Sequence, residues 1–108
     1  MSRRLPLLVA ALAMAAVAIA LLGRPNGDVE VEEGVVVAVD AAGLADVRGF
    51  TLRTADARTV TFRIGEQENG AEFPPSHLFE HQATSQAVRV MYRRDGTDLI
   101  AFRIEDAP

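Results

Sequence analysis

Apolar and polar residues follow two different patterns along this chain. Leu5 to Leu22 is an unbroken run of 18 apolar residues, and short segments of alternating apolar and polar residues make up most of the remainder. A run of this length that is apolar on every face predicts a membrane-entering helix rather than a buried core helix. We therefore divide the chain into a signal or anchor segment at 1–23, a linker at 24–28 and a folded domain at 29–107.

The residues around the apolar run predict its orientation. Arg3 and Arg4 precede it, and positive residues before such a run stay on the cytoplasmic side. Small residues around Ala18 suit cleavage, but two leucines would then begin the mature chain. We favour an uncleaved, single-pass anchor that contacts the inner (cytoplasmic) membrane through Leu5–Leu22, with the C-terminal domain outside the cytoplasm. A secreted domain is the alternative if the segment is cleaved.

Residues 29–107 show the period of two that is typical of β-strands. In the third segment, for example, Val60, Phe62 and Ile64 fall on one side, and threonine and arginine fall on the other. Gly34 within the first segment predicts a bulge or bend. The expected strands are Val29–Asp40, Val47–Thr54, Arg58–Ile64, Gln86–Arg94 and Asp98–Glu105, with a helix over Ser76–Thr84.

The order of these elements indicates a mainly β fold. Three strands, one helix and two strands (β-β-β-α-β-β) is the order of a small five-stranded OB-like barrel, here preceded by one N-terminal apolar helix. An SH3-like barrel is the alternative. We expect the helix to close one end of the barrel through Leu78, Phe79 and Ala83. The side chains expected to face the core are Phe50, Leu52, Val60, Phe62, Ile64, Val88, Val90, Tyr92, Ile100, Phe102 and Ile104.

Composition removes several classes of function. The chain has no cysteine, which excludes disulfides, a lipidated cysteine and a cysteine-based zinc site. Its formal net charge is −4, and all 11 basic residues are arginine. Two of these arginines precede the apolar run, so the folded domain is more acidic than the whole chain. We therefore expect no nucleic-acid partner.

Several short segments resemble the cytochrome c maturation haem chaperone (protein E) family. They are Phe50-Thr-Leu52, Leu78-Phe79 and Val88-Arg-Val-Met-Tyr92, together with the N-terminal apolar run and the acidic start of the domain. The resemblance implies an anchored, extracytoplasmic OB barrel. That family attaches haem through a histidine, followed by a tyrosine, after the last strand. The tail Arg103–Pro108 contains neither residue, so we expect no haem and no other cofactor.

His77-Leu-Phe-Glu-His81 matches the H-x-x-E-H zinc motif. Histidines four apart on a helix share a face, so both could bind one metal ion while Glu80 activates water. A solvent-facing pair beside a buried Leu78 is the simpler interpretation. A metal or haem carrier that uses His77 and His81 is the first alternative, and a zinc metallohydrolase is the last. The acidic residues that could supply a third ligand are Glu72, Glu105 and Asp106.

The loop at 65–75 is the longest connection in the domain, and small barrels often place function on long loops. We expect a flexible acidic loop there that contacts a protein partner. Arginines on the outer face of the second and third strands extend the candidate surface. The candidate contact residues are Glu66, Glu68, Asn69, Glu72, Arg53 and Arg63.

No set of residues in the chain forms a convincing catalytic constellation. The three serines lie in no nucleophile motif, and no glycine-rich phosphate loop is present. We therefore expect no enzymatic activity. The sequence favours a non-catalytic, membrane-anchored or secreted extracytoplasmic binding or accessory module whose ligand it does not name.

Overall fold

The computed structural model describes residues 27–108. The signal or anchor segment at 1–23 and most of the linker lie outside these residues, so both remain predictions. Within residues 27–108, no helix is long and apolar enough to cross a membrane.

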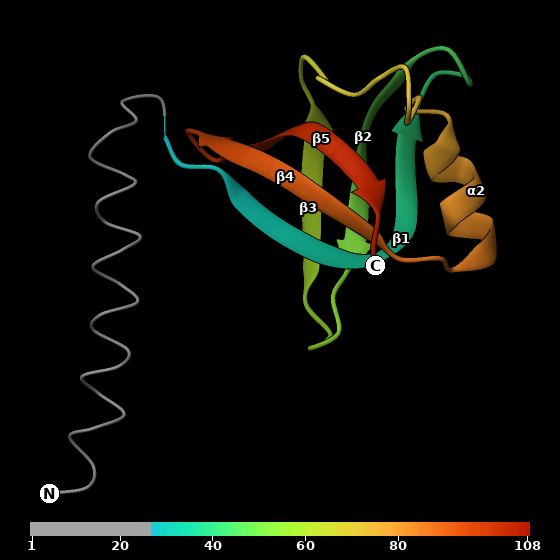
Figure 1. Ribbon diagram of the computed structural model, residues 1–108, viewed down its shortest axis with the longest axis horizontal. Coiled ribbons are helices and arrows are strands. Elements are labelled where there is room, and N and C mark those ends of the chain that lie inside the picture. Colours follow the sequence, from blue (N-terminus) through green and yellow to red (C-terminus); the bar gives the residue numbers. More distant parts are fainter. Residues whose placement is uncertain (1–26) are drawn as a thin grey trace, which may run out of the picture.

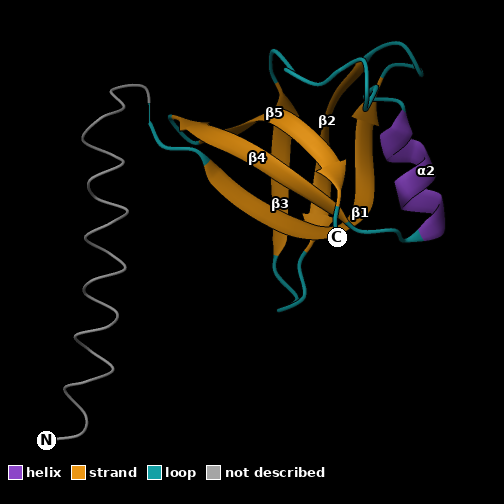
Figure 2. Cartoon of the chain, viewed as in Figure 1, coloured by secondary structure: helices purple, strands orange, loops and turns teal. Residues whose placement is uncertain are grey.

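Residues 27–108 form a closed five-stranded barrel with one short helix (Figure 1, Figure 2). Neighbouring strands follow the order β1-β2-β3-β5-β4, and β4 pairs with β1 to close the barrel. The mainly β fold and the β-β-β-α-β-β order are confirmed. The elements are β1 (Glu30–Ala41), β2 (Val47–Arg53), β3 (Thr59–Ile64), α2 (His77–Thr84), β4 (Val88–Asp95) and β5 (Asp98–Asp106).

Strand β1 belongs to both sides of the barrel because it bends near Gly34. Glu30–Gly34 pairs with β4, and Val35–Ala41 pairs with β2. A Cβ atom on Gly34 would lie 2.5 Å from the carbonyl oxygen of Arg53. Only glycine therefore lets β2 approach so closely at this corner, and the bend expected there is confirmed.

The barrel is filled by aromatic and branched side chains from every strand. The ring of Phe62 lies 5.2 Å from that of Phe50 and 4.9 Å from that of Tyr92, which makes a central aromatic cluster. The inward orientation expected for these three residues is confirmed. The buried apolar residues are Val36, Phe50, Leu52, Phe62, Phe73, Leu78, Val88, Val90, Tyr92, Ala101 and Ile104.

A β-bulge in β5 overturns part of the expected core. Tyr92 pairs with Ala101 and Met91 pairs with Arg103, so Phe102 has no partner on β4. The extra residue shifts the alternation by one position. Ala101 is fully buried, whereas Ile100 and Phe102 are only partly buried and lie outside the core. The expectation that Ile100 and Phe102 face inward is therefore wrong.

The helix α2 packs beside β1 at one side of the barrel (Figure 1). Leu78 is fully buried, as expected, but Ala83 is exposed, and the second buried residue of the helix is His81 at 6% exposure. An eight-residue helix can bury only a narrow strip of its surface, and here Leu78 and His81, three residues apart, form that strip. The expectation of a solvent-facing histidine pair is therefore wrong for His81.

The 65–75 loop is fastened to the barrel rather than free. Asn69 is 4% exposed. Its Nδ2 donates to the carbonyl oxygen of Ile104 (2.6 Å), and its Oδ1 accepts from the Ile104 amide (3.3 Å). The Glu68 amide also donates to the Phe102 carbonyl oxygen (2.7 Å). The loop thus pairs with β5 beyond the two residue pairs that join β5 to β3, and these hydrogen bonds hold its first half against the barrel.

Candidate functional site

A hollow of about 990 Å³ lies between the 65–68 segment and the β4–β5 hairpin. We call it the hairpin groove. It lies on the outer side of the barrel, where the bulge in β5 brings its apolar side chains to the surface. The lining residues used below are Gly27, Glu66, Gln67, Glu68, Arg93, Arg94, Asp95, Ile100 and Phe102.

An arginine stacked on an aromatic ring forms part of the hairpin groove. The guanidinium carbon of Arg93 lies 4.1 Å from the centre of the Phe102 ring, which is cation–π geometry. Within residues 27–108, no carboxylate forms an ion pair with Arg93, and its N–H groups make no hydrogen bond to another side chain. Its neighbour Arg94 differs, because its Nε lies 2.7 Å from Glu30 Oε2. Arg93 therefore keeps its donors available in the groove.

Gln67 also lines the groove, and hydrogen bonds fix its side chain. Its Nε2 donates to the carbonyl oxygen of Phe73 (2.6 Å) and to Asn69 Oδ1 (3.1 Å). Its Oε1 is buried and has no hydrogen-bond partner among the described residues. Because this oxygen is shielded from solvent, it offers no contact to a ligand in the groove.

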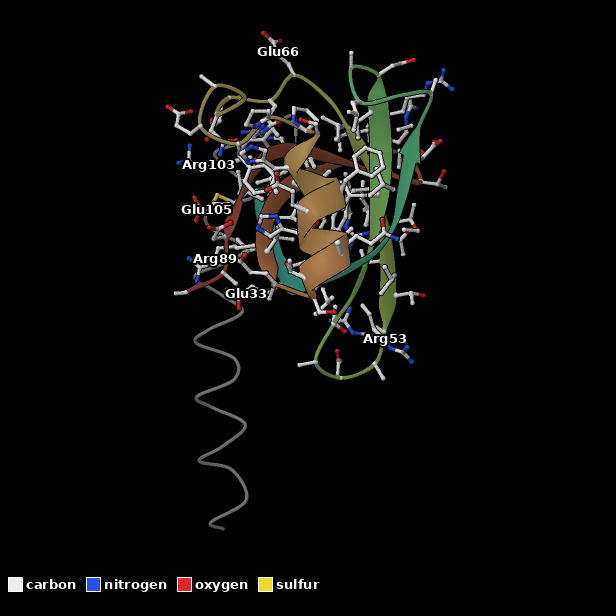
Figure 3. All side chains as sticks on the ribbon, turned by 90° about the vertical axis from the view of Figure 1, so that its right-hand side faces the viewer. Glu33, Arg53, Glu66, Arg89, Arg103 and Glu105 are labelled. Atoms are coloured by element: carbon white, nitrogen blue, oxygen red, sulfur yellow. The ribbon has the colours of Figure 1, made fainter. Side chains whose placement is uncertain are left out.

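A chain of ion pairs holds the wall of the groove against three strands (Figure 3). It crosses from β1 over β4 and β5 to the loop. Hydrogen bonds with Glu105 and then with Glu68 raise the pKa of Arg103 above its ordinary value, so this guanidinium stays charged. The successive pairs are Glu33–Arg89 (2.7 Å), Arg89–Glu105 (3.7 Å), Glu105–Arg103 (3.0 Å) and Arg103–Glu68 (3.3 Å).

The structure separates the acidic residues of the predicted contact surface. Glu66 and Glu68 line the hairpin groove. Asn69 is buried and holds the loop instead of facing a partner. Glu72 lies beside the histidines in another hollow. Only the first part of the predicted surface therefore belongs to the groove.

The two predicted arginines lie elsewhere on the barrel. Arg63 pairs with Asp98 (3.1 Å) and lines a hollow of about 790 Å³ over β1, β2 and β3. In that hollow the hydroxyls of Thr51 and Thr61 are 2.9 Å apart. Arg53 lies at the opposite end of the barrel from Glu66 (Figure 3). The predicted set therefore does not form one surface.

The two histidines do share one side of α2, beside a hollow of about 460 Å³. His81 Nε2 lies 2.7 Å from Asp106 Oδ1, and His81 Nδ1 lies 3.0 Å from the carbonyl oxygen of His77. Both ring nitrogens of His81 therefore face acceptors, and the ring ties α2 to the end of β5. The structure brings Asp106, one of the predicted third ligands, to this histidine. Glu80, the predicted base, is exposed and lines the same hollow.

A metal site at the histidines remains a prediction. Within residues 27–108, no three histidine or acidic side chains are grouped so that they could hold a metal ion. A zinc ion at His81 Nε2 would replace the hydrogen bond to Asp106, and structural zinc sites use four ligands. The hydrogen bonds of His81 therefore support a structural role for this residue better than a role as a metal ligand.

The sequence predicted Glu66 and Glu68 as contact residues of the hairpin groove, but it did not point to Arg93, Gln67 or Phe102. Phe102 fits the inward alternation of its strand, and the bulge that turns it outward has no local sequence signal. Arg93 and Gln67 are common types of surface residue. The adjacent arginines before the Asp95-Gly96 turn are visible in the sequence, but only the structure shows that Arg94 is paired with Glu30.

Comparison with known proteins assigns no family to this chain. No protein-family model matches it, and no curated protein matches it. One similar solved structure is CusF–Ag(I), residues 10–88, from Escherichia coli. It shares 15% sequence identity, with a TM-score of 0.48, over 78% of this chain and 98% of that chain. The barrel implied by the resemblance to the haem chaperone family is present, but membership of that family is not shown.

Proposed function

We propose that this chain is a non-catalytic binding module that takes a protein partner in the hairpin groove. The observation that best supports this proposal is that Phe102 points out of the barrel and that Arg93 lies over its ring. We further propose that the N-terminal segment holds the module at the outer side of the membrane, or that its removal releases the module.

The composition of the groove supports a protein partner. Aromatic and arginine side chains are enriched among the residues that dominate binding energy, especially where they lie in concave, well-packed places. Phe102 and Ile100 supply apolar surface that the bulge has removed from the core. Arg93 is held in place by stacking, so less side-chain freedom is lost on binding.

The position of the groove fits the proposed attachment. Gly27, where the described chain begins, lines the groove beside the β4–β5 hairpin (Figure 1). A partner in the groove would therefore lie next to the segment that leads to residues 1–23. This arrangement suits a module that acts on another protein at the same membrane.

Photo-crosslinking in intact cells tests the proposal. A photoreactive amino acid is placed at Glu66, at the edge of the groove, or at Ala55, an exposed residue in the turn between β2 and β3 as a matched control. We expect a discrete protein adduct from position 66 only, and a weaker one after Phe102→Ser. Equal adducts from both positions, or an adduct unaffected by Phe102→Ser, would contradict the proposal.

A further inference from the structure

We propose that the hairpin groove recognises the C-terminal end of a peptide chain, with its carboxylate on Arg93 and an apolar last side chain beside Phe102. The inference rests on the proposed function and adds the chemical class of the ligand.

Arg93 is suited to a carboxylate. Its guanidinium is planar and fully charged, and two of its parallel N–H groups match the two oxygens of one carboxylate. The contact with the Phe102 ring, at 4.1 Å, restrains the position of the guanidinium. No described carboxylate neutralises it, whereas the other arginine on the hairpin, Arg94, is paired with Glu30. A ligand carboxylate would therefore complete a site that is otherwise charged and unpaired.

The other charges of the groove favour a ligand with a single negative charge. Glu66 and Asp95 also line it, and neither forms an ion pair within residues 27–108. Arg94 and Glu68 line it too, but Arg94 is paired with Glu30 and Glu68 with Arg103. Two nearby carboxylates repel a doubly charged phosphate more strongly than a carboxylate. We therefore expect the groove to bind phosphate more weakly than a peptide carboxylate.

Apolar side chains extend the recognition beyond the carboxylate. Ile100 and Phe102 supply an apolar surface in the same groove as Arg93. A peptide end offers a carboxylate and a side chain on adjacent carbon atoms. Acetate offers only the carboxylate, and phosphate offers neither.

Binding of two matched peptides to the full-length protein in detergent micelles tests this inference. The probes are N-acetyl-alanyl-alanyl-leucine with a free carboxylate and the same peptide with a C-terminal amide. We expect the carboxylate form to bind at least about tenfold more tightly, because a charge-assisted bidentate contact is lost in the amide. The NMR signal of the Arg93 Nε–H group should shift with the carboxylate form.

Substitutions separate recognition from folding. Arg93→Gln should reduce the affinity for the carboxylate form to that for the amide, and Arg93→Lys should restore it only in part, because lysine lacks the planar fork. The matched control is Arg48→Gln, which removes an exposed arginine whose one ion pair within residues 27–108 is with Asp46. Circular dichroism checks that each variant is folded.

Three results would overturn the inference: equal affinity for both peptides, undiminished binding by Arg93→Gln, or equal displacement of the peptide by inorganic phosphate. If the crosslink at position 66 persists while the peptides are not distinguished, the groove binds a protein by other chemistry. In that case this inference fails and the proposed function stands. If neither crosslink nor peptide binding is found, both fail.

Discussion

Asn69 should contribute far more to stability than its place in a surface loop suggests. Its side-chain amide pairs with both backbone groups of Ile104, which is itself fully buried. Asn69→Ala leaves the Ile104 carbonyl and amide without partners. Each buried, unsatisfied group costs about 1–3 kcal/mol, so we expect a loss of about 2–5 kcal/mol in the free energy of unfolding. Small domains have about 5–15 kcal/mol in total, so this is a large fraction.

Urea unfolding of the full-length protein measures this loss. The chain has no tryptophan and a single tyrosine, Tyr92, which is buried in the core, so tyrosine fluorescence reports on the barrel alone. With a urea slope of about 1–3 kcal/mol per molar, the midpoint should fall by roughly 1–2 M or more. The control is Glu66→Ala, an exposed change in the same loop that should alter stability by less than about 0.5 kcal/mol.

A second substitution distinguishes hydrogen bonding from loss of volume. Asn69→Asp keeps the shape and the acceptor but replaces the Nδ2 donor, which faces the Ile104 carbonyl oxygen, with a carboxylate oxygen. We expect it to be at least as destabilising as Asn69→Ala at neutral pH. If Asn69→Ala costs less than about 0.5 kcal/mol, the hydrogen bonds to Ile104 do not stabilise the barrel and the reasoning is refuted.

Three other predictions follow from the packing. His81→Ala should lower the urea midpoint by the equivalent of about 1–3 kcal/mol, because the ring joins α2 to β5, whereas His77→Ala should change it little. An equal effect from both would contradict this assignment. Phe102→Ser should lower the free energy of unfolding, measured by the same urea assay, by clearly less than the roughly 3–5 kcal/mol typical of a core phenylalanine. A loss as large as that of a core phenylalanine would mean that Phe102 lies inside the barrel. Burial, and then Glu30 and Glu32, raise the pKa of Tyr92 above its ordinary value of 10.0. The contribution of neutral Tyr92 to stability is therefore complete below about pH 10 and is lost as the pH rises through the folded-state pKa. Absorbance at 295 nm should show that Tyr92 ionises at a higher pH in the folded protein than in the unfolded chain. Ionisation of both at the same pH would refute the shift.

The strands could be predicted because their alternation is regular and one face of each is buried. Val60, Phe62 and Val90 follow this rule, and the strand ends differ from the observed ones by only one or two residues. Gly34 could be assigned a bend because glycine within a strand allows close backbone approach. These features depend on short-range patterns that the sequence contains.

The groove could not be predicted because it depends on how distant segments meet. Ile100, Phe102 and Ile104 alternate perfectly in the sequence, yet the closure of the barrel inserts a bulge at Phe102. Asn69 resembles any polar loop residue until Ile104 is found beside it. His81 is buried where α2 meets the end of β5, and its hydrogen-bond partner Asp106 lies 25 residues away in the sequence. In each case the deciding contact is long-range.

The hydrogen bonds between Asn69 and Ile104 also protect a chemically labile residue. The next residue is Gly70, and asparagine before glycine is prone to attack of the glycine nitrogen on the side-chain carbonyl, which releases ammonia through a cyclic imide. In the folded barrel the amide is held by Ile104 and shielded from water. An unfolded chain loses this protection, and the aspartate that forms can no longer donate to the Ile104 carbonyl. Each unfolding event therefore exposes Asn69 to deamidation, and a deamidated chain refolds to a less stable barrel. Slow unfolding protects the protein from this chemical damage.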